Sequence, residues 1–194
     1  MKKTGLFFGT FNPVHMGHMV IASYMAEFTE LDEVWFVITP KSPFKQKQSL
    51  LDNHHRYQMV FEAIKEYPKL KASKIEFDMP QPNYTIHTLV KLGEEFGENH
   101  EFSLIMGEDN LKSLHKWKNY ELILENHDIY VYPRIGTAAA PSALKDHPRI
   151  KTTDAPIIEL SSTFIRKQHK AGKNIRSMLP ESVWKYMDEM NFYR

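Results

Sequence analysis

Apolar runs typical of buried strands alternate along this chain with segments in which apolar residues recur at helical spacing. The pattern predicts strands at residues 3–9, 33–39, 74–78, 101–106, 128–132 and 156–160. It predicts helices at residues 16–30, 51–67, 85–96, 110–114, 120–125, 163–171 and 182–190, with 141–147 as a further helical candidate. This alternation favours an α/β fold with a mostly parallel sheet covered by helices on both faces. Ligands of such sheets bind outside the carboxyl ends of the strands, near the reversal of strand order.

Length and composition limit the functions open to the chain. At 194 residues it has the size of one domain, 1–194, with a small helical region at about 162–194. The 25 basic and 24 acidic residues give a formal net charge of +1, which provides no broad positive field for nucleic acid. The absence of cysteine excludes disulfides and thiolate chemistry and fits a reducing, cytoplasmic setting. We expect no membrane partner, and the sequence leaves open whether the chain forms a homo-oligomer.

Candidate chemistry is concentrated in the turn between the first strand and the first helix, where residues 9–18 read Gly-Thr-Phe-Asn-Pro-Val-His-Met-Gly-His. A tight turn before a helix start directs backbone N–H groups and the positive end of the helix dipole at one spot, which suits a phosphate. His15 and His18 would add two imidazoles there, while Gly17 lets a ligand approach the backbone. Thr10 would add a hydroxyl group. The alternatives are two helix-capping histidines or, more weakly, a zinc site, because neither cysteine nor a His-Glu-x-x-His pattern accompanies the pair.

A second candidate phosphate site lies late in the chain, at residues 160–167, which read Leu-Ser-Ser-Thr-Phe-Ile-Arg-Lys. Ser161, Ser162 and Thr163 offer hydroxyl and N–H groups at a predicted helix start. Arg166 follows one turn later and is able to fold back onto the same anion. Taken alone, these serine and threonine residues would be read as helix caps.

Together the two segments resemble the nucleotidyltransferase superfamily, Rossmann-like proteins with an early His-x-Gly-His and a late Ser-Thr-x-x-Arg signature. Over nearly its whole length the chain is similar to the family of bacterial nicotinate-nucleotide adenylyltransferases. Further blocks carry this resemblance: residues 40–45, 56 with 59, 83–85 with 88–89, 106–111 with 117, and 179–180 with 192–194. Two positions depart from the family pattern, since Phe8 stands where the family usually has glycine and Asn12 where it usually has aspartate.

The resemblance implies a doubly wound, Rossmann-like fold and adenylyl transfer from ATP to nicotinate mononucleotide, giving deamido-NAD and pyrophosphate in NAD biosynthesis. It implies that His15, His18 and Arg166 are catalytic. The implied ATP-binding residues are Gly9, Thr10, Phe11, His15, Gly17, His18, Gly107, Asp109, Ser162, Thr163 and Arg166. The implied substrate-binding residues are Lys41, Lys45, Tyr84, Thr85 and Trp117.

Several of these residues also have plain structural interpretations. Trp117 would give a flat apolar wall for a pyridine ring, but tryptophan is often buried for packing alone. Thr85 would supply a donor to a ring carboxylate, or it and its neighbour would simply begin a helix. Asp109 would accept from a ribose hydroxyl or be a solvated acid at a helix start. Lys41 and Lys45 would hold the mononucleotide phosphate or belong to a solvated basic loop.

The expected mechanism is an in-line attack of the mononucleotide phosphate on the α-phosphate of ATP without a covalent intermediate. His18 would contact the α-phosphate and His15 the β/γ side. Mg²⁺ would bridge the phosphates, held mainly by substrate oxygens and water. The alternatives are a nicotinamide-mononucleotide or dual-specificity adenylyltransferase, a phosphopantetheine or cytidylyl transferase, or a nucleotide-binding regulator without turnover.

Overall fold

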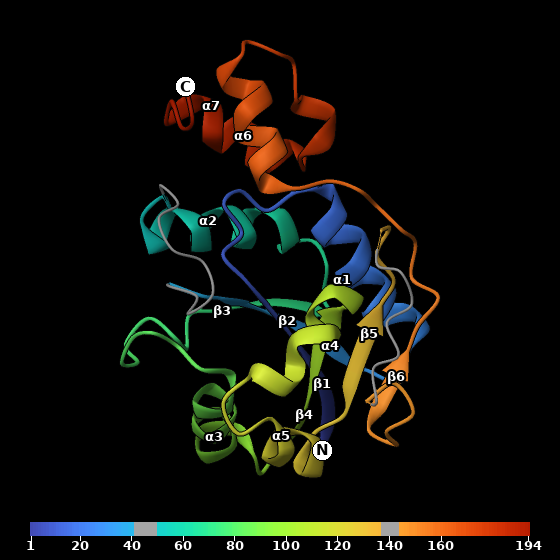
Figure 1. Cartoon of the computed structure of the whole chain (residues 1–194). Helices are drawn as coiled ribbons and strands as arrows, with labels where there is room; N and C mark the ends of the chain where they lie inside the picture. Colours follow the sequence, from blue (N-terminus) through green and yellow to red (C-terminus); the bar gives the residue numbers. More distant parts are fainter. Residues whose placement is uncertain (41–49, 137–143) are drawn as a thin grey trace.

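A six-stranded parallel sheet forms the centre of the molecule (Figure 1). The computed structural model describes residues 1–40, 50–136 and 144–194. The strands are β1 Lys2–Gly9, β2 Glu33–Ile38, β3 Leu70–Ser73, β4 His100–Gly107, β5 Ile129–Tyr132 and β6 Ile150–Thr152. Their spatial order is β3-β2-β1-β4-β5-β6, and every neighbouring pair is parallel. The predicted fold class is confirmed, and the order reverses between β1 and β4, which end at Gly9 and Gly107.

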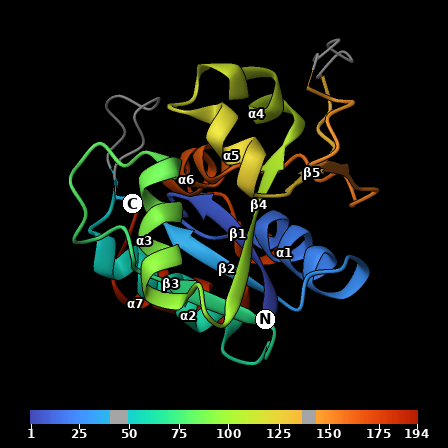
Figure 2. The same ribbon diagram turned by 90° about the horizontal axis from the view of Figure 1, so that it is seen from below.

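Helices cover both faces of the sheet (Figure 2). They are α1 Met16–Phe28, α2 Asn53–Ile64, α3 Thr85–Phe96, α4 Glu108–Ser113, α5 Tyr120–Asn126, α6 Ser162–Lys170 and α7 Glu181–Glu189, with 3-10 turns η1 Leu114–Lys116 and η2 Arg176–Met178. Because side chains alternate along a strand, Phe7 of β1 belongs to the core cluster that contains residues of α1, α2 and α7, whereas Leu6 belongs to the cluster that contains residues of α3, α4 and α5. The helices α6 and α7 stand together at the top of Figure 1, beside α2. Within the described ranges, we find no helix with the length and apolar character needed to span a bilayer.

The third strand lies earlier than predicted. Residues 75–78 form a turn, and β3 at Leu70–Ser73 pairs with β2 instead. The alternation of Ile75 and Phe77 imitates a strand, but the Phe77 ring packs against Tyr57 of α2, with ring centroids 6.3 Å apart. Side-chain burial in a turn has therefore produced a false strand pattern.

The last strand was also predicted wrongly. Residues 156–160 have no regular structure, and the sheet ends at β6, Ile150–Thr152, which pairs with β5. Pro156 lacks the N–H group that a ladder needs, and Ile157 is 51% exposed. The proposed helix at 141–147 lies partly outside the described residues, and its described part, 144–147, is a turn.

Candidate active site

The turn after β1 is packed so closely that glycine is needed at its start. A Cβ on Gly9 would lie 2.8 Å from the Phe11 ring. Phe11 itself is buried, has a φ of 45°, and packs edge-on against His18 with centroids 5.0 Å apart. Aromatic packing therefore fixes the path of this turn into α1 and places the histidines at the switch point of the sheet.

The two histidines form one stacked unit at the start of α1. The N–H group of His15 donates to Nδ1 of His18 at 3.2 Å. Because that nitrogen accepts, the proton of neutral His18 is on Nε2, which makes Nε2 a hydrogen-bond donor. His15 is only 4% exposed, and burial, followed by the charge of Arg134, lowers its pKa to about 4. A Cβ on Gly17 would come within 3.1 Å of the His15 ring, so any larger residue there would have to displace that ring by a few tenths of an ångström.

The start of α6 is joined directly to the same turn. The hydroxyl of Ser162 donates to the carbonyl of Pro13 at 2.8 Å. Arg166 donates through Nη1 to the carbonyl of Asn12 at 2.6 Å and through Nη2 to Thr163 Oγ1 at 3.4 Å. Ser161 is the N-cap of α6 and accepts from the N–H of Phe164. The two signature segments, about 150 residues apart in sequence, are therefore one structural unit.

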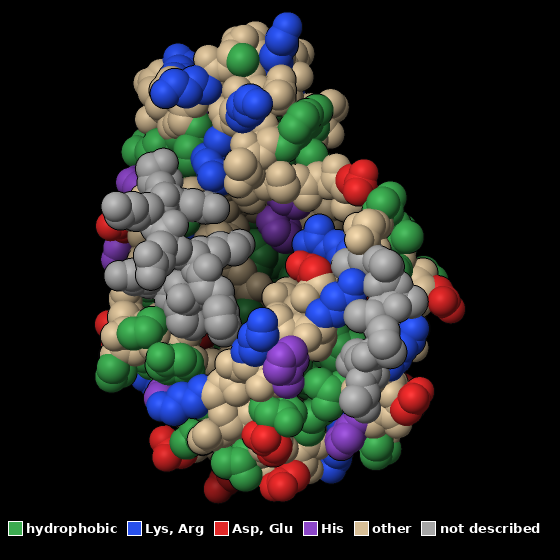
Figure 3. Space-filling model, in the orientation of Figure 1, with side chains coloured by type: hydrophobic (Ala, Val, Ile, Leu, Met, Phe, Trp, Pro, Cys, Tyr) green, Lys and Arg blue, Asp and Glu red, His purple; other side chains and the backbone are tan. Residues whose placement is uncertain are grey.

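A cavity of about 290 Å³, here called the histidine cavity, opens onto this unit. All the predicted ATP-binding residues line it except Gly107. Gly107 instead caps α4, where its Cβ would lie 2.5 Å from Asp109 Oδ1. Figure 3 shows a histidine side chain in this hollow, close to basic and acidic side chains. Imidazoles, an arginine and the N-termini of α1 and α6 converge here, which is the donor set of a polyphosphate site.

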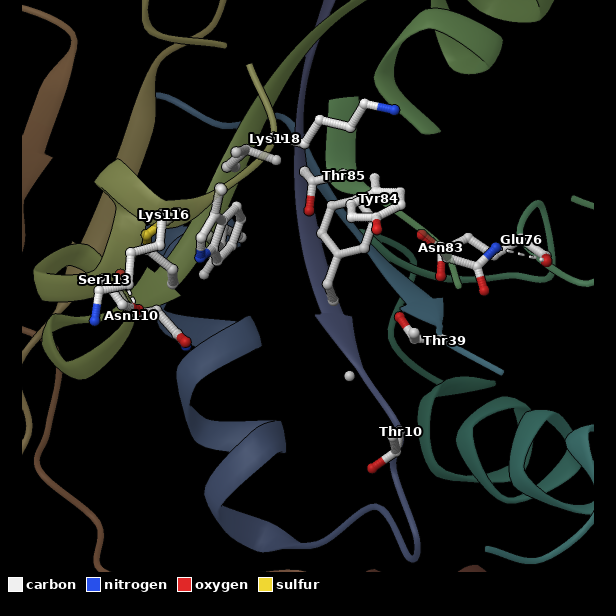
Figure 4. A pocket seen from close by; sticks show the side chains of 16 residues that line it. Thr10, Thr39, Glu76, Asn83, Tyr84, Thr85, Asn110, Ser113, Lys116 and Lys118 are labelled. Carbon is white, nitrogen blue, oxygen red and sulfur yellow. Dashed lines mark hydrogen bonds between the residues drawn. The ribbon is translucent and has the colours of Figure 1, made fainter. Parts of the chain in front are cut away.

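A larger cavity of about 690 Å³, here called the aromatic cavity, adjoins the first (Figure 4). Both are lined by Phe8, Gly9, Thr10 and Asn110. Tyr84, Thr85 and Trp117 also line the aromatic cavity, as predicted for the substrate site. Lys41 and Lys45 lie outside the described residues.

Comparison with known proteins agrees with this geometry. A cytidylyltransferase-like family model matches residues 6–168. The probable nicotinate-nucleotide adenylyltransferase of Christiangramia forsetii is 61% identical over 193 residues, covering 100% of this chain and 99% of the relative. That of Flavobacterium johnsoniae is 59% identical, covering 99% of each chain.

The chain belongs to the cytidylyltransferase-like family, among the nicotinate-nucleotide adenylyltransferases. The solved Plasmodium falciparum nicotinic acid mononucleotide adenylyltransferase complexed with NaAD has a TM-score of 0.80. It is 21% identical and covers 100% of this chain and 98% of the solved one. At that identity the likeness shows the fold alone.

This adenylyltransferase-family site also contains residues that sequence reasoning did not assign. Arg134 follows β5, lines the histidine cavity, and has its Nε 3.6 Å from Asp109 Oδ1. Its position just after a strand end was the available signal, since such ends point at the expected ligand site. Lys116 and Lys118 line the aromatic cavity, and the Lys118 ammonium lies 4.9 Å from the centre of the Tyr84 ring.

Buried polar groups brace the wall of the aromatic cavity in this family member. The Thr88 hydroxyl donates to Glu76 Oε1 at 2.7 Å, and Asn83 Nδ2 donates to the Glu76 carbonyl at 3.3 Å. Burial raises the pKa of Glu76, against the hydrogen bonds from Thr88 and Thr39. These contacts hold the turn that leads to Tyr84, so the first turn of α3 faces the cavity in a fixed orientation.

Proposed function

We propose that this chain transfers the adenylyl group of ATP to nicotinate mononucleotide, giving deamido-NAD and pyrophosphate. One observation carries the proposal: Gly9 and Thr10 line both the histidine cavity and the aromatic cavity. A triphosphate in the first and a pyridine mononucleotide in the second would therefore meet at the carboxyl end of β1. The curated relatives named for this activity, up to 61% identical over the whole chain, support the assignment.

The reaction needs no protein nucleophile. A phosphate oxygen of the mononucleotide attacks the α-phosphorus of ATP, a P–O bond forms there, and the bond to the β-phosphate breaks as pyrophosphate leaves. Catalysis then consists of positioning and of stabilising charge. In this proposal the Nε2–H of His18 donates to the α-phosphate, and neutral His15 lies on the β/γ side.

Arg166 and the start of α6 hold the leaving pyrophosphate in this proposal. The Ser162 hydroxyl already donates to Pro13. The backbone N–H groups of Ser162 and Thr163, which belong to the first turn of α6, are therefore the donors available to an anion. Arg166 adds a permanent positive charge.

In this proposal the pyridine ring binds in the aromatic cavity, which Trp117 and Tyr84 both line. Its carboxylate is directed toward Thr85, at the positive end of α3. The neighbouring Lys118 favours an anionic ring substituent over a carboxamide. Lys41 and Lys45 stay predictions for the mononucleotide phosphate.

Mg²⁺ is proposed as a companion of the nucleotide. In the ranges that the structure describes, no three His, Cys, Asp or Glu residues are grouped as a metal site. The ion would be held chiefly by phosphate oxygens and water and would neutralise phosphate charge. A cytoplasmic location and the absence of nucleic-acid or membrane partners stay predictions, and the oligomeric state stays open.

Pyrophosphate release with ATP and Mg²⁺ tests the proposal, with nicotinate mononucleotide and nicotinamide mononucleotide compared side by side. We expect rapid turnover with the acid and little with the amide. Equal or reversed rates would assign the enzyme to the dual-specificity or amide type. Nucleotide binding without turnover of either mononucleotide would replace the proposal with a regulator.

A further inference from the structure

Asn12 is a buried junction between three distant parts of the chain. Its Oδ1 accepts from the hydroxyl of Tyr193 at 2.5 Å and from the N–H of Leu51 at 3.2 Å. Because a backbone N–H only donates, this side-chain atom must be the amide oxygen. The Tyr193 hydroxyl therefore donates its proton to Asn12.

The same residue holds the arginine of the phosphate site. The backbone carbonyl of Asn12 accepts from Arg166 Nη1 at 2.6 Å. A single residue, fully buried, thus separates the Tyr193 hydroxyl from the guanidinium group that lines the histidine cavity. Burial raises the pKa of Tyr193, against the charges of Arg166 and Arg56, so its hydroxyl keeps its proton at neutral pH.

The segment that carries Tyr193 is itself fixed in place. The N–H of Phe192 donates to the carbonyl of Met187 at 3.0 Å. The Phe192 ring packs against His55 of α2, with centroids 4.8 Å apart. Ser182 of α7 also donates to the carbonyl of Glu62 in α2 at 2.9 Å. Tyr193 is therefore presented to Asn12 by a packed helix pair rather than by a loose end.

We propose that Tyr193 is a positioning residue for adenylyl transfer, whose hydroxyl fixes Asn12 and through it the placement of Arg166 against the histidine turn. This inference rests on the proposed function. Reactions that depend on alignment lose rate steeply when a contacting group is displaced by a fraction of an ångström to one ångström. A small loss of order at Asn12 is therefore expected to affect the pyrophosphate side of the site more than the pyridine side.

The test compares Tyr193→Phe with the matched control Tyr130→Phe in the full chain. Tyr130 lies in β5, is 4% exposed, and lines neither cavity. Tyr193→Phe leaves Asn12 Oδ1 with its Leu51 donor, so no buried acceptor is orphaned. We expect Tyr193→Phe to lower kcat about tenfold and to weaken pyrophosphate binding by a similar factor, with the KM for nicotinate mononucleotide unchanged.

Hydrogen exchange provides a readout that does not depend on turnover. Amides in residues 9–18 should exchange faster in Tyr193→Phe than in Tyr130→Phe, without any nucleotide present. Equal exchange, equal kcat and equal pyrophosphate affinity in the two variants would overturn the inference. If the unmodified chain released no pyrophosphate, the proposed function would fail instead, and exchange together with pyrophosphate affinity would still decide the role of Tyr193.

Discussion

The imidazole rings of His15 and His18 lie stacked, with centroids 3.7 Å apart and planes inclined by 25°. Two protonated rings at that distance would repel each other strongly in a buried site. This repulsion is avoided because His15 stays neutral: burial and the charge of Arg134 disfavour its protonated form. In the proposed reaction the pair would therefore offer the phosphates one neutral ring, His15, and one ring, His18, whose Nε2 can donate.

The low pKa of His15 predicts a specific pH dependence of stability. Its pKa is about 4 in the folded state, below the ordinary histidine value of 6.5. The unfolded chain therefore binds more protons between these values, and folding stability falls as pH decreases from about 6.5 to 4. Full protonation of His15 would lower the free energy of unfolding by about 3 kcal/mol.

Urea unfolding of the unmodified chain and of His15→Asn across pH 4 to 7 measures this contribution. The half-buried His127, whose pKa is lowered by burial, is common to both proteins, so its contribution cancels in the difference. Between pH 7 and pH 4, the free energy of unfolding of the variant should fall by about 3 kcal/mol less than that of the unmodified chain. If the free energy of unfolding changed with pH identically in the two proteins, the lowered pKa of His15 would be contradicted.

His18 is expected to act mainly on the chemical step. In His18→Ala the Nε2 donor to the α-phosphate is lost, so kcat should fall by about two to three orders of magnitude with little change in either KM. Steady-state pyrophosphate release checks this. His115→Ala, which removes an exposed histidine that lines neither cavity, should behave as the unmodified enzyme. A near-normal kcat in His18→Ala would remove His18 from the mechanism.

Trp117 is expected to act on binding of one substrate only. Trp117→Ala removes a flat wall of the aromatic cavity and should raise the KM for nicotinate mononucleotide about tenfold, while the KM for ATP stays the same. Trp117→Phe keeps a ring and should recover most of the affinity. Initial-rate measurements with each substrate varied separate the two effects. A rise confined to the KM for ATP would show that Trp117 is not the pyridine wall.

The histidine turn and the start of α6 could be selected as candidate sites from the sequence because each is a run of consecutive residues. At a strand-to-helix junction, glycine and proline set the shape of the turn, and histidine, serine and threonine supply hydrogen-bond donors. Residues 9–18 alone therefore predict a phosphate site. The cavity lining agrees with that set of residues, although their catalytic roles stay predictions. The parallel α/β fold was predictable for the same reason, from the period of local apolar patterns.

The features that were missed depend on contacts distant in sequence. β6 is defined by pairing with β5, not by its three residues, Ile150–Thr152. Arg134 enters the histidine cavity only because β5 lies beside β4, which ends at Gly107. Single-sequence patterns contain neither of these strand pairings, so the sequence signal for Arg134 was limited to its place just after the predicted strand at 128–132.

The structural role of Arg56 also depends on contacts that are distant in sequence. This fully buried side chain donates through Nε to the carbonyl of Leu51 at 3.0 Å. Its Nη1 donates to the carbonyls of Thr10 at 2.6 Å and Thr39 at 2.9 Å, which follow β1 and β2. Burial lowers its pKa, and the hydrogen-bond partners in the described part of the chain are oxygens of neutral groups.

Arg56→Lys should therefore destabilise the fold although it keeps the charge. A lysine has one ammonium group and cannot reproduce the planar fork, so at least one buried carbonyl loses its donor. We expect a loss of about 2–4 kcal/mol in the free energy of unfolding, measured by urea denaturation. The matched control is Arg176→Lys, where an arginine with a side chain 57% exposed pairs with Glu181, and there the change should stay within about 0.5 kcal/mol. Equal losses in the two variants would mean that the Arg56 hydrogen bonds do not hold the ends of β1 and β2 together.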